Sequence, residues 1–292
     1  MKLTTLKHIS VLILAVLSLS SFAFAAWEDG DTAGPVGAPL STLDGATAGS
    51  SECDLGSYAA DAVRRCLNAD VAIVNSGDLA GDFPANVVTY GDIRTVFAND
   101  RALAVARISA AQLCRLIEDA LSHITVDRQS DTIDRQASDF GGFPQISGME
   151  LVYDGSANPG ERIYTLELSD GRTVSPDDND TVITLAATEY MLSGGWGYST
   201  ETEYEPAGMT LSEAVAEYIA GGEVSFDSGR IKAIGVNDTW LVDALPKGVL
   251  PAIVIALIVF FLVVSFRFND IKFNIYYARE ADGGKYVRRK RQ

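Results

Sequence analysis

The sequence predicts a mixed α/β fold of the α+β class for residues 36–234, together with one transmembrane helix near the C-terminus. Helical patterns of apolar residues and short strand patterns occur along the chain without strict alternation, which favours this class over a regularly alternating fold. Capping boxes at Ser109–Gln112 and Thr210–Glu213 mark two helix starts. An uncharged run of 19 residues, Gly248–Phe266, can cross a bilayer core of ~30 Å as a helix.

The first predicted helix runs from Leu55 to Leu67. Its apolar residues recur at the spacing of one helix face, and Asp54 stands in the position of the N-cap. The segment Val71–Val74 is typical of a short buried strand, because its apolar run ends in a turn signal. That turn is Asn75–Asp78, an Asn-Ser-Gly-Asp sequence.

The remaining elements follow in order. Alternation predicts a strand at Leu103–Ile108, and the capping box at Ser109 opens a second helix. One face of this helix carries five apolar residues: Leu113, Leu116, Ile117, Ala120 and Leu121. Three further strands are expected: Met149–Tyr153, Ile163–Leu168 and Val182–Ala187. The last helix begins after Thr210 and ends at the pair Gly221-Gly222.

Signals at both ends of the chain predict its organisation around a membrane. Residues 1–25 are predicted to be a signal peptide, because basic residues and an apolar stretch precede Ala23-Phe24-Ala25; the alternative is an uncleaved first transmembrane helix. We expect a flexible lead-in at residues 26–35, a stalk at 235–247 and the transmembrane helix at 248–266. The tail at 267–292 holds eight Lys or Arg, which predicts a cytoplasmic location for it.

This arrangement predicts a single-pass type I protein of the cell membrane, with its N-terminal domain on the extracytoplasmic side. Membrane lipid is then a partner of Gly248–Phe266 and of the basic tail.

Charge is distributed unevenly between these parts. The whole chain has 39 acidic and 23 basic residues; without the two basic residues of the leader and the eight basic and three acidic residues of the tail, 36 acidic and 13 basic residues remain, a net charge of −23. Nucleic-acid binding needs clustered positive charge, so no nucleic-acid partner is expected.

Histidine and cysteine content limits the chemistry. Once His8 leaves with the leader, His123 remains as the single histidine. A dinuclear metallophosphatase site needs several His and Asp ligands, and the general base of a Ser or Cys nucleophile is usually a histidine. No catalytic residue, metal ligand or cofactor is predicted, and His123 is interpreted as a surface residue at a helix end. Among Cys53, Cys66 and Cys114, only Cys66 with Cys114 is considered as a disulfide; three buried thiols are preferred.

Six short segments stand in one order along the domain: Glu52–Gly56 with Asp61-Ala62, Val71–Gly77, Thr89–Asp92, Ile146–Met149, Tyr190–Tyr198 and Gly229–Ile231. Together, from about Val36 to Ile234, they resemble the motifs of the C-terminal domain of 5′-nucleotidases. The resemblance implies the fold of that domain and the binding of a nucleoside or nucleotide ligand. In that family a separate N-terminal metallophosphatase domain holds the metals and cleaves the phosphate. No such domain is expected in this chain, so a separate metallophosphatase chain is the implied partner.

The resemblance also assigns a ligand site. Its residues are Asn75, Tyr190, Gly194, Gly195 and Trp196. Tyr190 matches one of two aromatic residues that sandwich the base, and Trp196 replaces an aspartate that binds the ribose hydroxyls. A large aromatic next to Tyr190 can instead build a less polar pocket.

Three other family positions are altered. Ser51 and Ala80 stand in place of arginines, and Asn99 stands in place of the second aromatic, which the nearby Phe97 can replace only if its loop shifts. A lost base stack is worth ~1–3 kcal/mol, and a lost charge-assisted hydrogen bond ~1.5–3 kcal/mol. Together these losses remove most of a micromolar affinity of ~8 kcal/mol, so weak nucleotide binding is expected.

The sequence leaves two main functional hypotheses. The first is an accessory of extracellular nucleotide breakdown that holds a nucleoside-like ligand and is not catalytic alone. The second is a surface interaction or structural module that has kept the fold and lost the ligand. An enzyme of another class that uses His123 is a third hypothesis.

Overall fold

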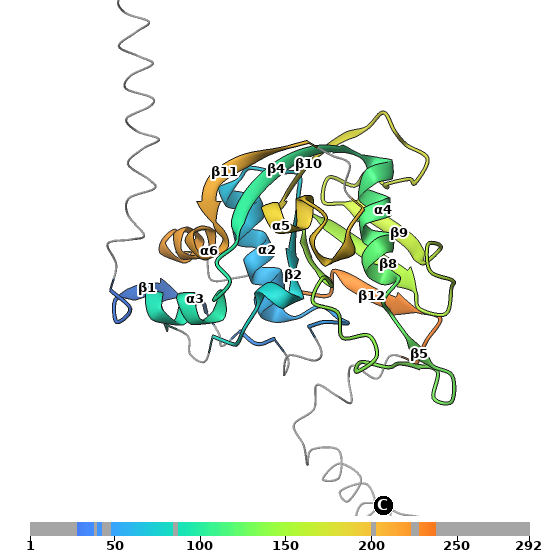
Figure 1. The fold of residues 1–292 in the computed structure, drawn as a ribbon, viewed down its shortest axis with the longest axis horizontal. Coiled ribbons are helices and arrows are strands. Elements are labelled where there is room, and N and C mark those ends of the chain that lie inside the picture. The colour runs from blue at the N-terminus through green and yellow to red at the C-terminus, as the bar shows by residue number, and fades with distance from the viewer. Residues whose placement is uncertain are drawn as a thin grey trace, which may run out of the picture. The chain divides into compact units, whose positions relative to one another are not determined.

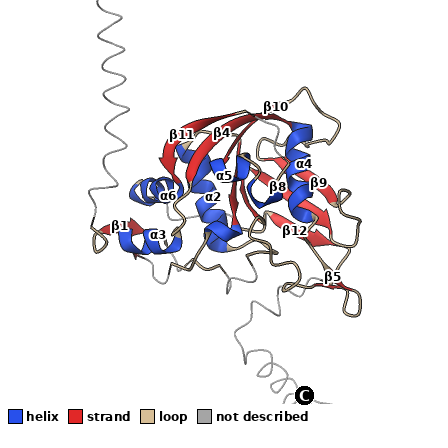
Figure 2. Cartoon of the chain, viewed as in Figure 1, coloured by secondary structure: helices blue, strands red, loops and turns tan. Residues whose placement is uncertain are grey.

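A five-stranded mixed sheet forms the centre of the computed structural model (Figures 1 and 2). Its strand order is β11 (Tyr204–Thr210), β4 (Ala102–Ser109), β10 (Val182–Thr188), β2 (Val71–Asn75) and β7 (Pro144–Ser147). Neighbouring β10 and β2 run parallel, and the other pairs are antiparallel. Parallel and antiparallel pairs in one sheet confirm the predicted mixed α/β class.

The structure describes residues 28–37, 40–42, 48–83, 87–199, 203–222 and 228–237. The predicted signal peptide at 1–25, the transmembrane run Gly248–Phe266 and the basic tail lie outside these ranges. Within them, no helix combines the length and the apolar character that a membrane crossing requires.

Five described α-helices and two short 3-10 helices accompany the sheet: α2 (Asp54–Cys66), α3 (Tyr90–Val96), α4 (Ala110–Leu121), α5 (Glu189–Leu192), α6 (Leu211–Ala220), η2 (Ser76–Asp78) and η3 (Gly195–Gly197). The predicted capping boxes at Ser109 and Thr210 are both formed, and Thr89 with Asp92 makes another. The predicted cap of α2 is wrong by one residue. The Cys53 thiol accepts the hydrogen bond from the Gly56 amide, and Asp54 is the first residue of the helix.

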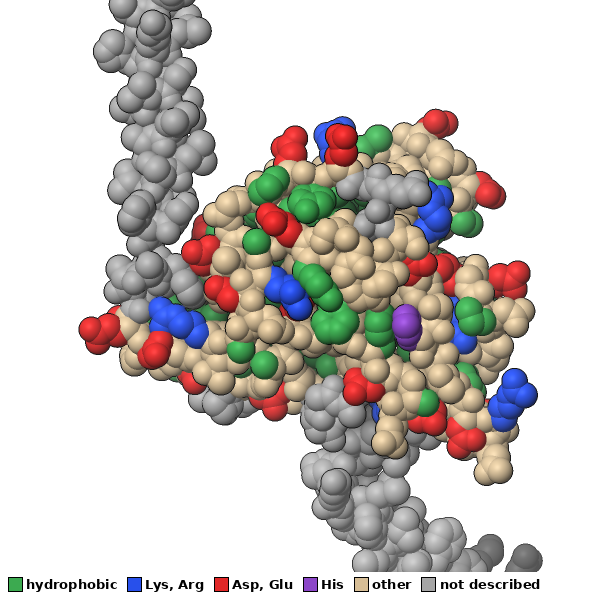
Figure 3. All heavy atoms as spheres, viewed as in Figure 1, with side chains coloured by type: hydrophobic (Ala, Val, Ile, Leu, Met, Phe, Trp, Pro, Cys, Tyr) green, Lys and Arg blue, Asp and Glu red, His purple; other side chains and the backbone are tan. Residues whose placement is uncertain are grey.

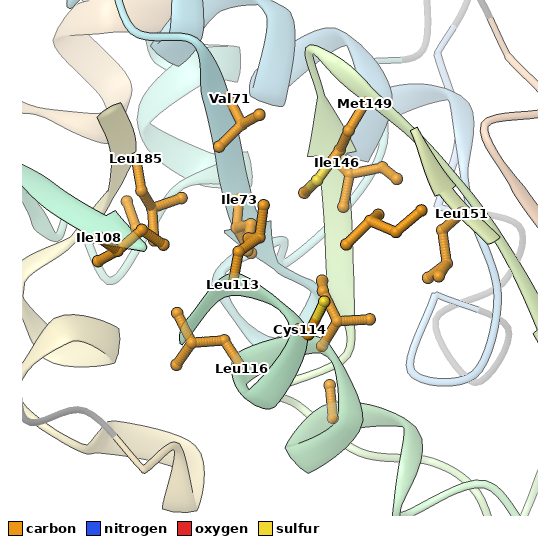
Figure 4. Close-up of a cluster of buried hydrophobic side chains, with 14 of the residues drawn as sticks. Val71, Ile73, Ile108, Leu113, Cys114, Leu116, Ile146, Met149, Leu151 and Leu185 are labelled. Atoms are coloured by element: carbon orange, nitrogen blue, oxygen red, sulfur yellow. The ribbon is translucent and has the colours of Figure 1, made fainter. Parts of the chain in front are cut away.

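The central sheet separates two hydrophobic clusters. Along β2, Val71 and Ile73 enter one cluster, and Ala72 and Val74 enter the other, as the alternation of a strand requires. The first cluster lies against α4, and Figure 4 shows its side chains filling the space between the sheet, α4 and β8. The second cluster lies against α2, α3 and α6. Helical cover on both faces explains why every residue of β2 is buried.

A smaller sheet packs beside the first cluster. Its strand order is β12 (Ile231–Ile234), β8 (Met149–Asp154) and β9 (Ile163–Leu168), with β12 parallel to β8. The polar segment after α4 forms a two-stranded hairpin of β5 (Val126–Asp127) and β6 (Thr132–Ile133). The predicted strands at 149–153, 163–168 and 182–187 are therefore confirmed within one residue.

Parts of the predicted flexible lead-in and of the predicted stalk belong to the folded domain. Residues 32–35 of the lead-in form β1 (Thr32–Pro35), which pairs antiparallel with β3 (Val87–Thr89). At the other end, the Asn237 amide donates a hydrogen bond to the Asp131 carbonyl (2.6 Å), so the first stalk residues are bound to the domain. In both cases the backbone finds a partner that lies far away in the sequence, and local composition cannot show it.

All three cysteines are free thiols in the structure. Cys53 and Cys114 are buried, as preferred in the sequence interpretation, whereas Cys66 is half-buried and donates to the Ala214 carbonyl (3.5 Å). Burial raises the pKa of Cys53 to about 12 and the pKa of Cys66 and of Cys114 to about 11. These thiols stay protonated near neutral pH, so none is an activated nucleophile.

Candidate functional site

The predicted site residues gather at one edge of the central sheet. Strands β2 and β10 are parallel neighbours, so their C-terminal ends meet at the same edge. Asn75 ends β2, and the segment Tyr190–Tyr198 follows β10. This topology brings Asn75, Tyr190, Gly195 and Trp196 together, although more than 100 residues separate the two segments.

Tyr190 presents the exposed aromatic ring of this site, with 40% of the residue accessible to solvent. One part of the ring is covered by Arg101, whose guanidinium carbon lies 3.9 Å from the ring centroid. The backbone of Gly195 also lies against the ring, since a methyl group on Gly195 would come within 2.5 Å of Tyr190 Cδ1. Glycine is therefore required at position 195 for this close approach.

Arg101 is held in place by a buried carboxylate. Its Nε donates to Asp78 Oδ1 at 2.5 Å, and the Asp78 side chain is only 1% exposed. Burial raises the pKa of Asp78, while the hydrogen bond and the charge of Arg101 act in the opposite direction. The guanidinium thus lies between a buried anion and an aromatic ring, two groups that both favour a cation.

Trp196 fills a slot whose walls are glycines. Methyl groups on Gly77, Gly141 and Gly142 would each come within 2.7 Å of Trp196 side-chain atoms. The backbone of Trp196 has a φ of 59°, in the left-handed region that large residues rarely adopt. Such strain persists where the surroundings hold the residue in place, and the slot supplies that packing.

Asn75 and Tyr198 anchor the floor of the site. Asn75 Nδ2 donates to the Gly142 carbonyl (3.0 Å) and to the Tyr198 hydroxyl (3.3 Å), and that hydroxyl donates to the same carbonyl (2.6 Å). Burial raises the pKa of Tyr198, which keeps it a neutral hydrogen-bond donor. Asn75 is fully buried, so its role here is to join β2 to the Gly141-Gly142 turn.

Unsatisfied polar atoms concentrate at this site. The described residues contain four buried side-chain nitrogen or oxygen atoms without a hydrogen-bond partner, and three of them are Asn75 Oδ1, Asp78 Oδ2 and Trp196 Nε1. All three belong to the elements that meet at this sheet edge. Buried polar atoms are normally satisfied, so this concentration distinguishes the candidate site from the packed core around it.

Ring contacts continue from this site to the surface histidine. Phe140 lies edge-on to Trp196 at 6.4 Å, and His123 stacks on Phe140 with 3.7 Å between ring centroids. In Figure 3, the histidine appears in purple beside green apolar side chains on the exposed face. His123 is exposed and its ring stacks on Phe140, in agreement with the interpretation of His123 as a surface residue at a helix end.

The altered family positions lie at different distances from the site. Asn99 is exposed and its Nδ2 donates to the Gly77 carbonyl (3.3 Å), so it reaches the wall of the Trp196 slot. Ser51 Oγ accepts from Arg135 (3.2 Å), and Ala80 is exposed with its amide donating to the Val96 carbonyl (2.7 Å). Phe97 does not replace the second aromatic, because it is 1% exposed and packs against Phe83 in the second cluster.

Sequence reasoning missed Asp78, Arg101 and the Gly141-Gly142 pair. Asp78 was visible as part of a turn signal, and a glycine pair between a polar segment and a strand also marks a turn. No local pattern marks Arg101, which stands one residue before β4 and joins the site only through the fold. No group of three or more His, Cys, Asp or Glu side chains that could hold a metal is found in the part of the chain that the structure describes.

We expect Gly141→Ala to displace the Trp196 indole. The added methyl would lie 2.5 Å from the Trp196 ring, and such overpacking costs typically ~1–3 kcal/mol. Tryptophan fluorescence should shift to longer wavelength and the thermal unfolding midpoint should fall. Gly81→Ala is the matched control, because nothing lies within 4 Å of a methyl at that position. If the two variants show the same fluorescence maximum and the same unfolding midpoint, Trp196 does not pack against Gly141 as described.

Comparisons with known proteins bear on the whole domain. The family model described as "5′-nucleotidase, C-terminal domain" matches residues 30–203. The trifunctional nucleotide phosphoesterase protein YfkN of Bacillus subtilis is 27% identical over 195 residues, covering 63% of this chain and 12% of the relative. A probable 5′-nucleotidase of Treponema pallidum is 29% identical over 136 residues, covering 45% of this chain and 21% of the relative.

The solved structures agree on the fold. A 5′-nucleotidase precursor from Thermus thermophilus superposes with a TM-score of 0.60 at 19% identity, covering 71% of this chain and 40% of that chain. The chain thus spans less than a quarter of the length of the two relatives and less than half of the solved structure.

Proposed function

Because the chain belongs to the 5′-nucleotidase C-terminal domain family, we propose that its domain holds the nucleoside part of a nucleotide while a metallophosphatase on a separate chain removes the phosphate. The domain of this family is the substrate-binding part of nucleotidases. The proposal concerns binding and presentation, and no catalytic step is assigned to this chain.

The observation that carries this proposal is the exposed ring of Tyr190 beside three unsatisfied buried polar atoms. A nucleobase needs an aromatic plane to stack on, and the exposed ring of Tyr190 offers one. A ribose needs hydrogen-bonding groups, and the Oδ2 atom of Asp78, the partner of Arg101, is an acceptor without a partner in the described structure.

The site suits a nucleoside better than its phosphate. Arg101 is the described cation that contacts this site, and its charge is already matched by Asp78. A phosphate group there would also meet the field of a chain with a net charge of −16. The phosphate is therefore expected to point away from this domain, toward the partner that cleaves it.

The proposed setting is the cell surface. In this setting the domain lies outside the cell, held by the apolar run 248–266 with the basic tail inside. An anchored domain can keep a ligand near a second protein without contributing to the chemistry.

Tyr190→Ala tests this function directly. The full-length chain in detergent should bind adenosine weakly, with a Kd on the order of 1 mM, which corresponds to about 4 kcal/mol. Loss of one stacked ring costs ~1–3 kcal/mol, so the variant should bind about five- to 150-fold more weakly in calorimetric titration. Tyr164→Ala is the matched control, since Tyr164 on β9 is 72% exposed and lies on the smaller sheet. Wild-type protein that binds neither adenosine nor AMP would refute the proposal.

One observation favours a second function. The site's own side chains occupy much of its space, with Trp196 in the glycine slot and Arg101 over Tyr190. A fold that is kept while its ligand site is closed is expected of a surface interaction module. If the domain is such a module, neither the wild-type protein nor Tyr190→Ala should bind adenosine or AMP in calorimetric titration. The nucleoside proposal predicts binding by the wild type and a measurable loss of affinity in the variant.

A further inference from the structure

A hollow lies at the opposite end of the central strands from Tyr190. It has a volume of about 450 Å³ and is lined by the last turns of α2, the turn between β7 and β8, and the beginning of β12. Ser147 pairs with Ala72 near the start of β2, whereas Asn75 ends that strand. Three strand residues of ~3.3 Å each separate the two levels, so this basic groove is distinct from the nucleoside site.

The groove is rich in cations on an acidic protein. Its lining includes Arg64, Arg65, Arg230 and Lys232, against the two carboxylates Asp61 and Glu150, which leaves a formal charge of +2. The whole chain carries −16. Local basic groups that oppose the overall field are what an anionic ligand requires.

Both oxygens of the Asp61 carboxylate accept hydrogen bonds within the wall of the groove. Its Oδ2 accepts from Arg230 at 2.8 Å, and its Oδ1 accepts from the Ser147 hydroxyl at 2.5 Å. The side chains of Arg230 and Asp61 are 11% and 13% exposed. Arg230 also donates to the Ile146 carbonyl (2.8 Å), so this arginine forms part of the wall and is satisfied there.

Arg64 lies beside this pair with most of its donors unused among the described residues. Its Nε donates to the Ser147 hydroxyl (2.8 Å), an uncharged partner that is itself turned toward Asp61. The Asp61 carboxylate is thus paired directly with Arg230, and it is linked to Arg64 only through the Ser147 hydroxyl. On the far side, Lys232 approaches Glu150 only at 3.9 Å, and both side chains are more than half exposed. The charges of Arg64 and Lys232 are thus poorly compensated within the described structure.

We propose that this groove binds a phosphate group, with Arg64 as its principal ligand and Lys232 as a second cation. A guanidinium presents planar donors that match the oxygens of a phosphate, and Ser169 and Ser228 are among the residues that line the same space. The group can belong to a small soluble phosphomonoester or to a phospholipid headgroup, which share this chemistry. The site is independent of the nucleoside proposal, because neither Tyr190 nor Arg101 contributes to it.

Phosphate titration of the full-length chain tests the groove. Calorimetry with sodium phosphate at constant ionic strength should show saturable binding, and Arg64→Gln should weaken it at least about tenfold, as expected for loss of one charged hydrogen-bond donor. Arg107→Gln is the matched control, because Arg107 is an exposed arginine on β4 outside the groove. Lys232→Gln, on an exposed side chain, provides a second variant if Arg64→Gln alters the thermal unfolding midpoint.

A second arm separates the two sources of phosphate. The chain is placed in nanodiscs of phosphatidylcholine with or without phosphatidate, and binding of inorganic phosphate is measured in each. If phosphate binds more weakly in the phosphatidate discs, and this difference between the discs disappears in Arg64→Gln, the groove is assigned to a lipid headgroup. Equal affinity for phosphate in the two kinds of disc assigns the groove to a soluble phosphate. Absence of saturable phosphate binding in phosphatidylcholine discs, or equal weakening by Arg64→Gln and Arg107→Gln, overturns the proposal.

Discussion

Asp61→Ala should lower the free energy of unfolding by about 3–5 kcal/mol, the cost of removing one partner of a buried ion pair. Asp61 and Arg230 join α2 to the segment before β12, and both side chains are nearly buried. The alanine variant leaves the Arg230 guanidinium without its anion and removes the acceptor of the Ser147 hydroxyl. The unpaired buried charge dominates the expected loss, since the net value of the intact pair is small.

Urea unfolding followed by circular dichroism measures this effect in the full-length chain. Asp170→Ala is the control: Asp170 also bonds an arginine, Arg172, but their side chains are 53% and 48% exposed. Solvent screens such a pair, so that variant should unfold with little measurable change. If both variants unfold at the same urea concentration, the Asp61–Arg230 pair does not hold the domain together.

Removal of Arg101 should strengthen adenosine binding. The guanidinium lies 3.9 Å from the Tyr190 ring centroid and covers the plane on which we expect the base to stack. A cation–π contact is worth ~0.5–2 kcal/mol, so freeing the ring should raise adenosine affinity about two- to thirtyfold. This direction is unusual for a binding-site arginine, because the proposed ligand competes with Arg101 for the same ring.

The variant chosen for this titration must also keep the fold intact. Arg101→Ala alone leaves Asp78 as a buried carboxylate without its cation, which costs several kcal/mol, on the order of 3–5. The double variant Arg101→Ala with Asp78→Asn removes both charges, and it is titrated beside Asp78→Asn alone, because Asp78 is also the proposed acceptor for the ribose. Arg107→Ala, on β4 and exposed, should leave adenosine affinity unchanged. Unchanged or weaker binding by the double variant than by Asp78→Asn alone would show that Arg101 supports the ligand and does not compete with it.

Both predictions depend on elements that the sequence located well. The helices at 54–66, 110–121 and 211–220 follow from periodicity and capping boxes, because hydrogen bonds within three or four residues decide where a helix begins. Five of the strands, β2, β4, β8, β9 and β10, were also found, since the alternation of β4 and the apolar run of β2 are local patterns. The strand β1 escaped detection because its partner β3 lies more than 50 residues away.

The sequence predicted only some of the residues that form the candidate site. Tyr190, Gly195 and Trp196 stand in one short segment that resembles a known motif, and Asn75 stands in another. Arg101 and Asp78 became site residues only because parallel pairing of β2 and β10 brings their neighbours to one sheet edge. The sequence also suggested that Trp196 can build a less polar pocket next to Tyr190, whereas the structure places the Trp196 indole between glycines and the Arg101 guanidinium over the Tyr190 ring.

The amino-acid sequence by itself determined the class of fold, the family, the acidic character and the scarcity of histidine, because these depend on composition and on short-range pattern. Only the tertiary structure decided which charges meet: Arg101 with Asp78, and Arg230 with Asp61, with Arg64 linked to that second pair through the Ser147 hydroxyl. The physical reason is distance. Electrostatic and stacking energies act over a few ångströms in space, and residues separated by 23 or 169 positions come that close only when the chain is folded.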